Sequence, residues 1–258
     1  MKRFLITLVS IALVSGVSAP ARAGAGAGLS ATRQATPRAA TVRFVPRLIR
    51  QSSKRLRFTI KARYPQAAGA ARDRRLTRMN QELARFVTRE VAEFRSYFKT
   101  PGERYGPTGS YYESDYVVTL ATNDVVSVAF GISTYGEGAA HPNHTTLVFN
   151  YDLATGRKLG LPDLFKPGSN YLEVISQYAV KQLKDELQPE PGDDWIEQGA
   201  GPKLENYKRW NISPKGLEVT FDPYEVASYA EGIHEVVIPF SVLKEVIDPN
   251  GPLGRIQN

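Results

Sequence analysis

The sequence predicts an α+β fold, in which an antiparallel β-sheet packs against two long helices and a short C-terminal helix. Several stretches alternate apolar and polar residues, which is the pattern of half-buried strands, and turn residues join them in pairs. Two longer stretches carry apolar residues three or four positions apart, as on one face of a helix. The strands and helices do not alternate strictly along the chain, which argues against a doubly wound parallel sheet.

Residues 1–23 have the features of a cleavable secretory signal. Lys2 and Arg3 precede an apolar run that is too short to span a membrane, and Ala21 and Ala23 fit a cleavage site after residue 23. No later run is apolar enough for a transmembrane span, so we expect a secreted or periplasmic protein. The chain has no cysteine among its 258 residues, so we expect the core alone to stabilise it.

Residues 24–50 predict a flexible basic linker, because Gly, Ala and Arg are frequent in them. Between positions 24 and 72 the chain has eleven Lys or Arg and no acidic residue. After position 72, 19 basic and 26 acidic residues leave a net charge of −7. This basic N-terminal arm could contact an anionic envelope surface or could simply be solvated. Nucleic acid is not an expected partner, because no aromatic residues interleave with the basic ones.

The first strand and the first helix are predicted from local periodicity. Residues 55–64 (RLRFTIKARY) alternate strictly, and Pro65 is expected to end the strand. Residues 72–98 carry an apolar helical stripe and predict the longest helix. Three members of this stripe should face the sheet together: Leu83, Phe86 and Phe94.

A Gly- and Tyr-rich connection over residues 105–116 leads into the central strands. Residues 116–121 and 125–135 predict a hairpin, and residues 144–151 predict a further strand that ends in the turn sequence DLATG.

The second half of the chain predicts one more long helix, over residues 170–187, with Ser169 as its N-cap. The remaining elements, in order, are a polar excursion, a two-stranded hairpin, a final strand and a short helix, over residues 189–202, 207–213 with 217–221, 235–239 and 241–247.

Three segments together carry a family resemblance: FTIKARYPQAAGAARDRRLTRMNQELARFV, EGAAHPNHTTLVFNYDLATGRKLGLPDLF and ENYKRWNISPKGLEVTFDPYEVASYAEGIHEVVIP. They resemble the extracytoplasmic module shared by the anti-sigma factor RsiV, the N-terminal region of PdaC-type peptidoglycan deacetylases and a secreted mycobacterial antigen. DPYEVASYAEG is the most specific piece. The resemblance implies an N-terminal half over residues 51–140, an RsiV C-terminal-like half over 141–248 and a tail over 249–258.

The resemblance also implies a function. In RsiV this module recognises lysozyme, so we expect a non-catalytic binding module for a cell-envelope protein or glycan, with lysozyme as one candidate. RsiV-like proteins carry a membrane span where this sequence has a cleavable signal. The deacetylases carry a separate catalytic domain after the module. We therefore expect neither anti-sigma activity nor deacetylase chemistry, and the sequence indicates no cofactor and no oligomeric state.

The loop between the strands at 125–135 and 144–151 is the candidate recognition site, because two of the three histidines lie in it. The candidate binding residues are Tyr135, Glu137, His141, Asn143 and His144. His141 and His144 form a His-x-x-His pattern, which is a weak metal signal without a third ligand at fixed spacing, so no metal site is predicted. The alternative interpretation is a purely structural loop.

Two other interpretations stay open. Asp193, Asp194 and Glu197 could act as acid and base in an enzyme acting on envelope polysaccharide, or could be solvated surface residues. The protein could also be a structural component of the envelope. Several aromatic residues could stack on sugar rings, although core packing is the favoured interpretation: Tyr105, Tyr111, Tyr112, Tyr116, Trp195 and Trp210. The segment 224–232 is expected to be a structural crossing.

Overall fold

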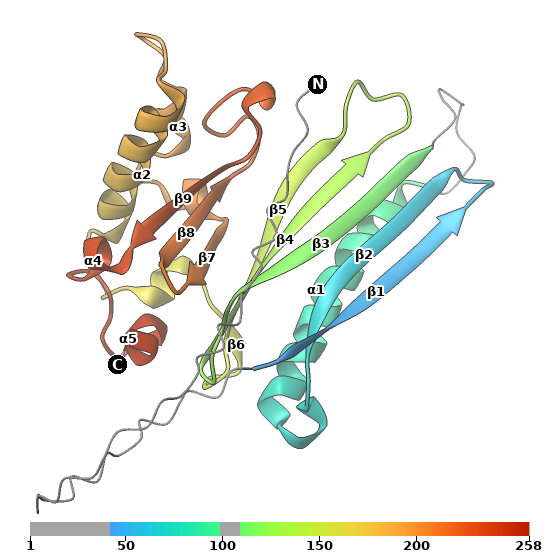
Figure 1. Cartoon of the computed structure of the whole chain (residues 1–258), viewed down its shortest axis with the longest axis horizontal. Helices are drawn as coiled ribbons and strands as arrows, with labels where there is room; N and C mark the ends of the chain where they lie inside the picture. The colour runs from blue at the N-terminus through green and yellow to red at the C-terminus, as the bar shows by residue number, and fades with distance from the viewer. Residues whose placement is uncertain (1–41, 99–108, 258) are drawn as a thin grey trace, which may run out of the picture. The chain divides into compact units, whose positions relative to one another are not determined.

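The structure, a computed structural model, describes residues 42–98 and 109–257 (Figure 1). Within these residues, nine strands form two sheets. The six-stranded sheet contains, in spatial order, β1 (Phe44–Ser53), β2 (Phe58–Ala67), β3 (Ser110–Ala121), β4 (Val125–Tyr135), β5 (Asn143–Asp152) and β6 (Arg157–Lys158). The three-stranded sheet contains β7 (Trp210–Ser213), β8 (Gly216–Phe221) and β9 (His234–Pro239). The predicted signal and the predicted linker up to residue 41 lie outside the described residues.

The described helices are α1 (Arg74–Ser96), α2 (Tyr171–Leu187), α3 (Trp195–Gly199), α4 (Phe240–Leu243) and α5 (Pro252–Gln257). The predicted α+β class is confirmed, but the single sheet is wrong: there are two sheets, and each of the longer helices packs on a different one. None of the described helices is long and apolar enough to cross a membrane.

The six-stranded sheet is antiparallel except between β2 and β3, which pair in parallel from Phe58↔Ser110 to Ala62↔Ser114. A parallel pair needs a crossover connection, and α1 provides it, lying against one face of the sheet (Figure 1). The other neighbouring pairs are joined by shorter connections.

The predicted stripe of α1 is confirmed. Met79, Leu83, Val87 and Val91 are buried against β2, β3, β4 and β5. Phe86 is only partly buried, and its ring lies 5.7 Å from Phe130 and 6.0 Å from Phe149, measured between ring centroids. The helix begins where the carboxylate of Asp73 accepts a hydrogen bond from the Arg75 N–H at 2.8 Å, an N-cap contact.

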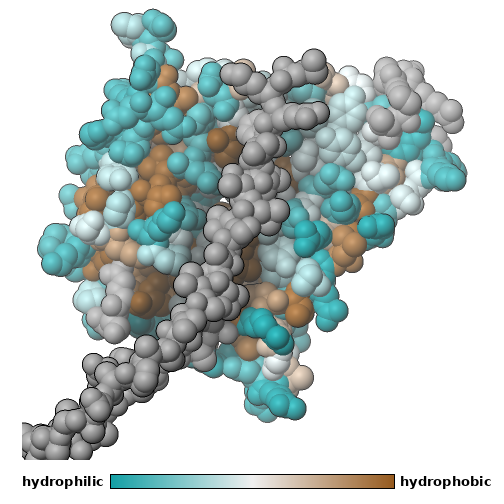
Figure 2. Space-filling view, viewed as in Figure 1, coloured by the Kyte–Doolittle hydropathy of each residue, from teal (hydrophilic) through white to brown (hydrophobic). Residues whose placement is uncertain are grey.

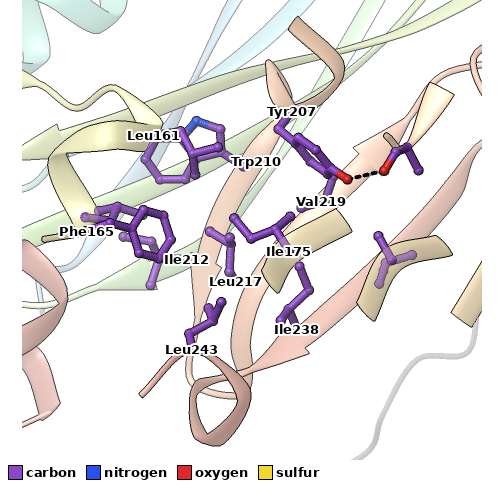
Figure 3. Close-up of a cluster of buried hydrophobic side chains, with 14 of the residues drawn as sticks. Leu161, Phe165, Ile175, Tyr207, Trp210, Ile212, Leu217, Val219, Ile238 and Leu243 are labelled. Carbon is purple, nitrogen blue, oxygen red and sulfur yellow. Dashed lines mark hydrogen bonds between the residues drawn. The ribbon is translucent and has the colours of Figure 1, made fainter. Parts of the chain in front are cut away.

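A second core lies between α2 and the three-stranded sheet (Figure 3). Ile175, Ala179 and Leu183 of α2 are fully buried in it. The Tyr207 hydroxyl is buried there as well and donates to the Ala200 carbonyl at 2.5 Å. Each sheet therefore has its own core and its own helix, whereas the sequence predicted a single sheet for all of the strands.

Buried polar side chains join the two sheets. The Ser127 hydroxyl donates to the Asn150 side chain at 2.6 Å and accepts the Ile212 N–H at 2.9 Å. The Asn150 amide donates to the Trp210 carbonyl at 2.7 Å. Since buried polar groups must be hydrogen-bonded, these contacts fix the register of β7 on β4 and β5.

The strand β1 corrects the predicted linker over residues 24–50. It pairs with β2 along its whole length, from Phe44↔Ala67 to Ser53↔Phe58. Nine of the eleven basic residues between positions 24 and 72 lie in the described residues, including Arg47 and Arg50 on β1. Most of the basic charge therefore belongs to the β1–β2 edge of the sheet rather than to a free arm.

Two more predicted boundaries before the central hairpin are wrong. Pro65 does not end β2, which continues to Ala67. Pro65 lies beyond the Phe58–Ala62 stretch that pairs with β3, and proline is tolerated where no ladder bond is required. The connection predicted over residues 105–116 becomes β3 from Ser110 onward.

Boundaries near the C-terminus also differ. Asn170, not Ser169, is the N-cap residue of α2, and its side chain makes no capping bond. The short helix predicted over residues 241–247 is only the one-turn helix α4. The predicted tail over 249–258 contains α5, where Leu253 is fully buried in the second core.

Candidate functional site

The candidate recognition loop connects β4 to β5. The two strands pair from Val125↔Asp152 to Thr134↔Asn143, so the sheet fixes both ends of the loop. Tyr135 ends β4, and its ring stacks on Tyr111 with centroids 5.8 Å apart. Asn143 begins β5 and is exposed. The loop was predicted at this place, and the hairpin that carries it is confirmed.

Glu137 was expected to present its charge to a ligand, and the structure instead pairs it within the protein. Its carboxylate accepts a hydrogen bond from the Arg57 Nε at 2.8 Å, and its N–H donates to the Ser110 hydroxyl at 2.9 Å. This hydrogen bond raises the pKa of Arg57. The Glu137 side chain is only 10% exposed, so it anchors the base of the loop to the turn between β1 and β2.

His141 and His144 lie together on one tyrosine, Tyr229. The His141 and Tyr229 rings have centroids 3.9 Å apart, and His144 is 6.4 Å from the same ring. The Tyr229 hydroxyl donates to the Pro142 carbonyl at 2.6 Å. Both histidines are exposed, so the segment around Tyr229 supports the loop from behind and leaves the imidazoles accessible.

The row of rings continues away from the loop. Tyr224 lies 5.7 Å from Tyr229 between ring centroids, and its carbonyl accepts a hydrogen bond from the Trp195 indole at 3.1 Å. The five side chains form what we call the aromatic row: His144, His141, Tyr229, Tyr224 and Trp195. They come from β5, the β4–β5 loop, the segment after β8 and α3.

Tyr224 is the most unusual member of the aromatic row. Its φ of 72° lies in the left-handed region, where a bulky residue is strained, and 56% of its surface is exposed. A hydrogen bond of 3.0 Å from its N–H to the Ala227 carbonyl holds this turn. Strained residues persist where the surrounding structure forces them, and they cluster at functional sites.

A buried ion network lies beneath the aromatic row. Asp222 accepts hydrogen bonds from the Thr145 hydroxyl at 2.5 Å and the Thr146 N–H at 3.0 Å. Arg209 pairs with Asp222 at 2.7 Å and with Glu225 at 2.5 Å. Burial acts to raise the pKa of Glu225, but hydrogen bonds from Arg209 and from the Asp222 N–H hold it below its usual value. The network ties the segment that carries Tyr224 to the edge of β5.

The acids proposed for catalysis do not join the histidines. Asp193, Asp194 and Glu197 line a groove of about 580 Å³ beside α3, and neither His141 nor His144 contributes to it. Glu197 pairs with Lys184, whose hydrogen bond lowers the Glu197 pKa. Among the described residues, no three His, Asp or Glu side chains converge as metal ligands would.

The aromatic residues weighed as sugar-stacking candidates divide into two groups. Tyr112 and Trp210 are 5% and 4% exposed and belong to the cores, and burial raises the pKa of Tyr112 to about 12. Tyr111 and Trp195 lie outside the cores. Tyr116 is partly buried against Phe130, and Tyr105 lies outside the described residues.

The sequence predicts the loop but not its contacts with Tyr229 or the neighbouring Tyr224, since the segment 224–232 has the pattern of a structural crossing. The family resemblance did mark DPYEVASYAEG as its most specific piece, and that was the available signal. In the structure the segment supports the loop through Tyr229 and also exposes Tyr224.

Comparisons with known proteins agree with the resemblance. Residues 162–241 match the family described as "Protein of unknown function (DUF3298)". The chain is 29% identical over 170 residues to peptidoglycan-N-acetylmuramic acid deacetylase PdaC of Bacillus subtilis, covering 66% of this chain and 36% of PdaC. It is 28% identical over 140 residues to the anti-sigma-V factor RsiV of the same organism, covering 52% of this chain and 47% of RsiV. The chain thus spans between a third and a half of these relatives.

Two crystal structures share the fold at 15% sequence identity. A DUF3298 family member from Bacteroides fragilis aligns with a TM-score of 0.61, covering 83% of this chain and 96% of that one. A DUF3298 family protein from Pseudomonas aeruginosa aligns with a TM-score of 0.56, covering 82% and 95%. The predicted similarity to the RsiV- and PdaC-like module is therefore confirmed.

Proposed function

We propose that this chain, which shares its module with RsiV and PdaC, is a non-catalytic secreted or periplasmic binding module for a cell-envelope ligand. The single observation that supports this proposal is the aromatic row: four of its rings are exposed and Tyr229 is partly exposed, while the charged groups beside it are paired with one another. Tyr and Trp are enriched among the residues that dominate protein interfaces. The nearby charged groups, Asp222, Arg209 and Glu225, are engaged with one another.

The proposed partner is a cationic lysozyme, which the resemblance to RsiV implies. Residues 73–258 have a net charge of −7, but the nine basic residues of positions 42–72 belong to the same folded module, so net charge does not favour a basic partner and the proposal rests on the aromatic row. The exposed histidines His141 and His144, together with Asn143, would supply hydrogen bonds around the tyrosines. Glu137 is left out of this contact set because it pairs with Arg57.

Calorimetric titration of the full chain with a cationic lysozyme tests this proposal. We expect Tyr224→Ala and Tyr229→Ala each to weaken binding roughly 30-fold, the effect of losing a hot spot worth about 2 kcal/mol. Tyr97→Ala is the matched control, because Tyr97 is 75% exposed at the end of α1 and outside the row. Equal affinities for all three variants would show that the aromatic row is not the contact surface. If the unmodified chain does not bind, lysozyme is excluded as the partner.

A second prediction concerns contact with an anionic envelope surface. Arg47 and Arg50 are exposed on β1, so exchanging both for Gln should weaken low-salt binding to anionic vesicles, and added salt should weaken binding by the unmodified chain. Deleting residues 24–41 also removes two basic residues, Arg33 and Arg38, so the two variants are matched in charge. If the β1–β2 edge makes the contact, the deletion should have the smaller effect. Vesicle sedimentation measures both, and the reverse order would assign the contact to the linker.

A further inference from the structure

A shallow groove of about 330 Å³ crosses the outer face of the six-stranded sheet, the face opposite α1. Ile60 and Ala62 of β2 are buried towards α1, so their neighbours Lys61 and Arg63 point to the other face and line the groove. Figure 2 shows hydrophilic and hydrophobic residues interspersed on the part of the surface that the grey residues leave in view. The charged side chains that line the groove, Lys61, Arg63, Glu113 and Asp115, can hydrogen-bond a polar ligand.

The charges that line the groove balance one another. Lys61 and Arg63 of β2 lie beside Glu113 and Asp115 of β3, and the Arg63 guanidinium and Asp115 carboxylate are 2.6 Å apart. Two cations and two anions leave no net charge, so neither an anionic nor a cationic ligand is favoured. Carboxylates and guanidinium groups can each bond two neighbouring hydroxyls, which suits a ligand with many hydroxyl groups.

Aromatic rings lie next to the polar strip. The stacked pair Tyr111 and Tyr135 lies beside the groove, and the Tyr111 hydroxyl is 3.4 Å from the hydroxyl of Ser133, which lines the groove. His144, the cross-strand partner of Ser133, also lines the groove. Aromatic rings give flat apolar surfaces beside polar groups, on which the C–H faces of sugar rings can pack.

The floor of the groove is open at Gly131. This glycine is exposed in the middle of β4, and a Cβ atom placed there would meet nothing within 4 Å. Its φ is not in the left-handed region, so a larger residue fits the backbone and would fill the groove. Gly131 therefore allows a substitution that blocks the groove without disturbing the core.

We propose that this groove binds a neutral oligosaccharide. The inference deepens the proposed binding function by giving a ligand class to a surface that meets the aromatic row at His144. It rests on the absence of net charge at the polar strip, the flanking rings and the space over Gly131. The module would then bind a glycan on the outer face of the sheet and a protein at the β4–β5 loop.

The experiment titrates the full chain with two neutral probes, the β-1,4-linked tetrasaccharides of N-acetylglucosamine and of glucose, and follows the Gly131 and Ser133 amide signals by NMR. We expect at least one probe to shift these signals at millimolar concentration. Gly131→Tyr should weaken that binding at least about tenfold, the equivalent of 1.4 kcal/mol. Val117→Tyr is the matched control and should bind as the unmodified chain does, because Val117 is 63% exposed on β3 and outside the groove.

Asp115→Asn provides a second variant, since Asp115 is exposed and its loss removes one hydrogen-bonding carboxylate without filling the groove. It should weaken binding while leaving the thermal midpoint of unfolding unchanged. No shift with either probe, or binding by Gly131→Tyr equal to that of the unmodified chain, would overturn the inference. The lysozyme titrations of Tyr224→Ala and Tyr229→Ala test the aromatic row separately. A negative result with the oligosaccharides would therefore reject the groove as a glycan site without rejecting the proposed function.

Discussion

Replacing Arg209 with alanine should lower the free energy of unfolding by about 3–5 kcal/mol, the cost of breaking a buried ion pair by removing one partner. Arg209 is 16% exposed and Asp222 is 7% exposed, and the guanidinium bridges Asp222 and Glu225. Its loss would leave the buried Asp222 carboxylate without its cation, and Glu225 with only the exposed Lys208. Urea denaturation monitored by circular dichroism measures the change.

The control for this variant is Lys208→Ala. Lys208 also pairs with Glu225, at 3.1 Å, but its side chain is 58% exposed. An exposed pair contributes about 0–1 kcal/mol, so the two cations that share one carboxylate should differ severalfold in effect. Equal effects of the two substitutions would mean that the network does not stabilise the segment that carries Tyr224.

The network also predicts a pH dependence. The pKa of Glu225 is lowered in the folded protein, so its contribution is fully present above the unfolded value of about 4.3 and is lost as the pH falls through the folded pKa. The stability difference between the unmodified chain and Arg209→Ala should therefore shrink below about pH 4. A difference that stayed constant down to pH 3 would exclude Glu225 as its source.

Elements with strong local periodicity could be predicted from the sequence. The β4–β5 hairpin and α1 bury one face each, so the alternation and the helical stripe are visible in the residues themselves. The edge strand β1 could not be predicted, because most of its side chains are exposed and carry no clear alternation. The parallel pairing of β2 with β3 depends on the crossover of α1, which local pattern does not specify.

Only the part of the candidate site whose residues are close together in the sequence could be predicted. The loop with His141 and His144 is visible as a break between two strands. Its partners are distant in sequence: Arg57 is 80 residues from Glu137, and Tyr229 is 87 residues from Pro142. Spacing along the chain cannot show such contacts. The sequence therefore did not show that Glu137 pairs with Arg57 or that Tyr229 supports the loop.

The second large effect is expected at the centre of α1. Leu83→Ala should cost about 2–5 kcal/mol, because Leu83 is fully buried against the six-stranded sheet and its removal leaves a cavity. Phe86→Ala should cost less than the 3–5 kcal/mol of a fully buried phenylalanine, since Phe86 is only partly buried between Phe130 and Phe149. Thermal and urea denaturation measure both variants.

This pair of variants also tests which core supports the candidate site. Leu83 belongs to the core of the six-stranded sheet, whereas Tyr224 lies between β8 and β9 of the three-stranded sheet. At a temperature where Leu83→Ala remains folded, its affinity for lysozyme should equal that of the unmodified chain, because no Leu83 contact reaches the aromatic row. A larger loss of stability for Phe86→Ala than for Leu83→Ala would show that α1 presents a different face to the sheet. A loss of affinity in folded Leu83→Ala would show that the aromatic row depends on the position of β4 and β5 as well as on the Asp222 network.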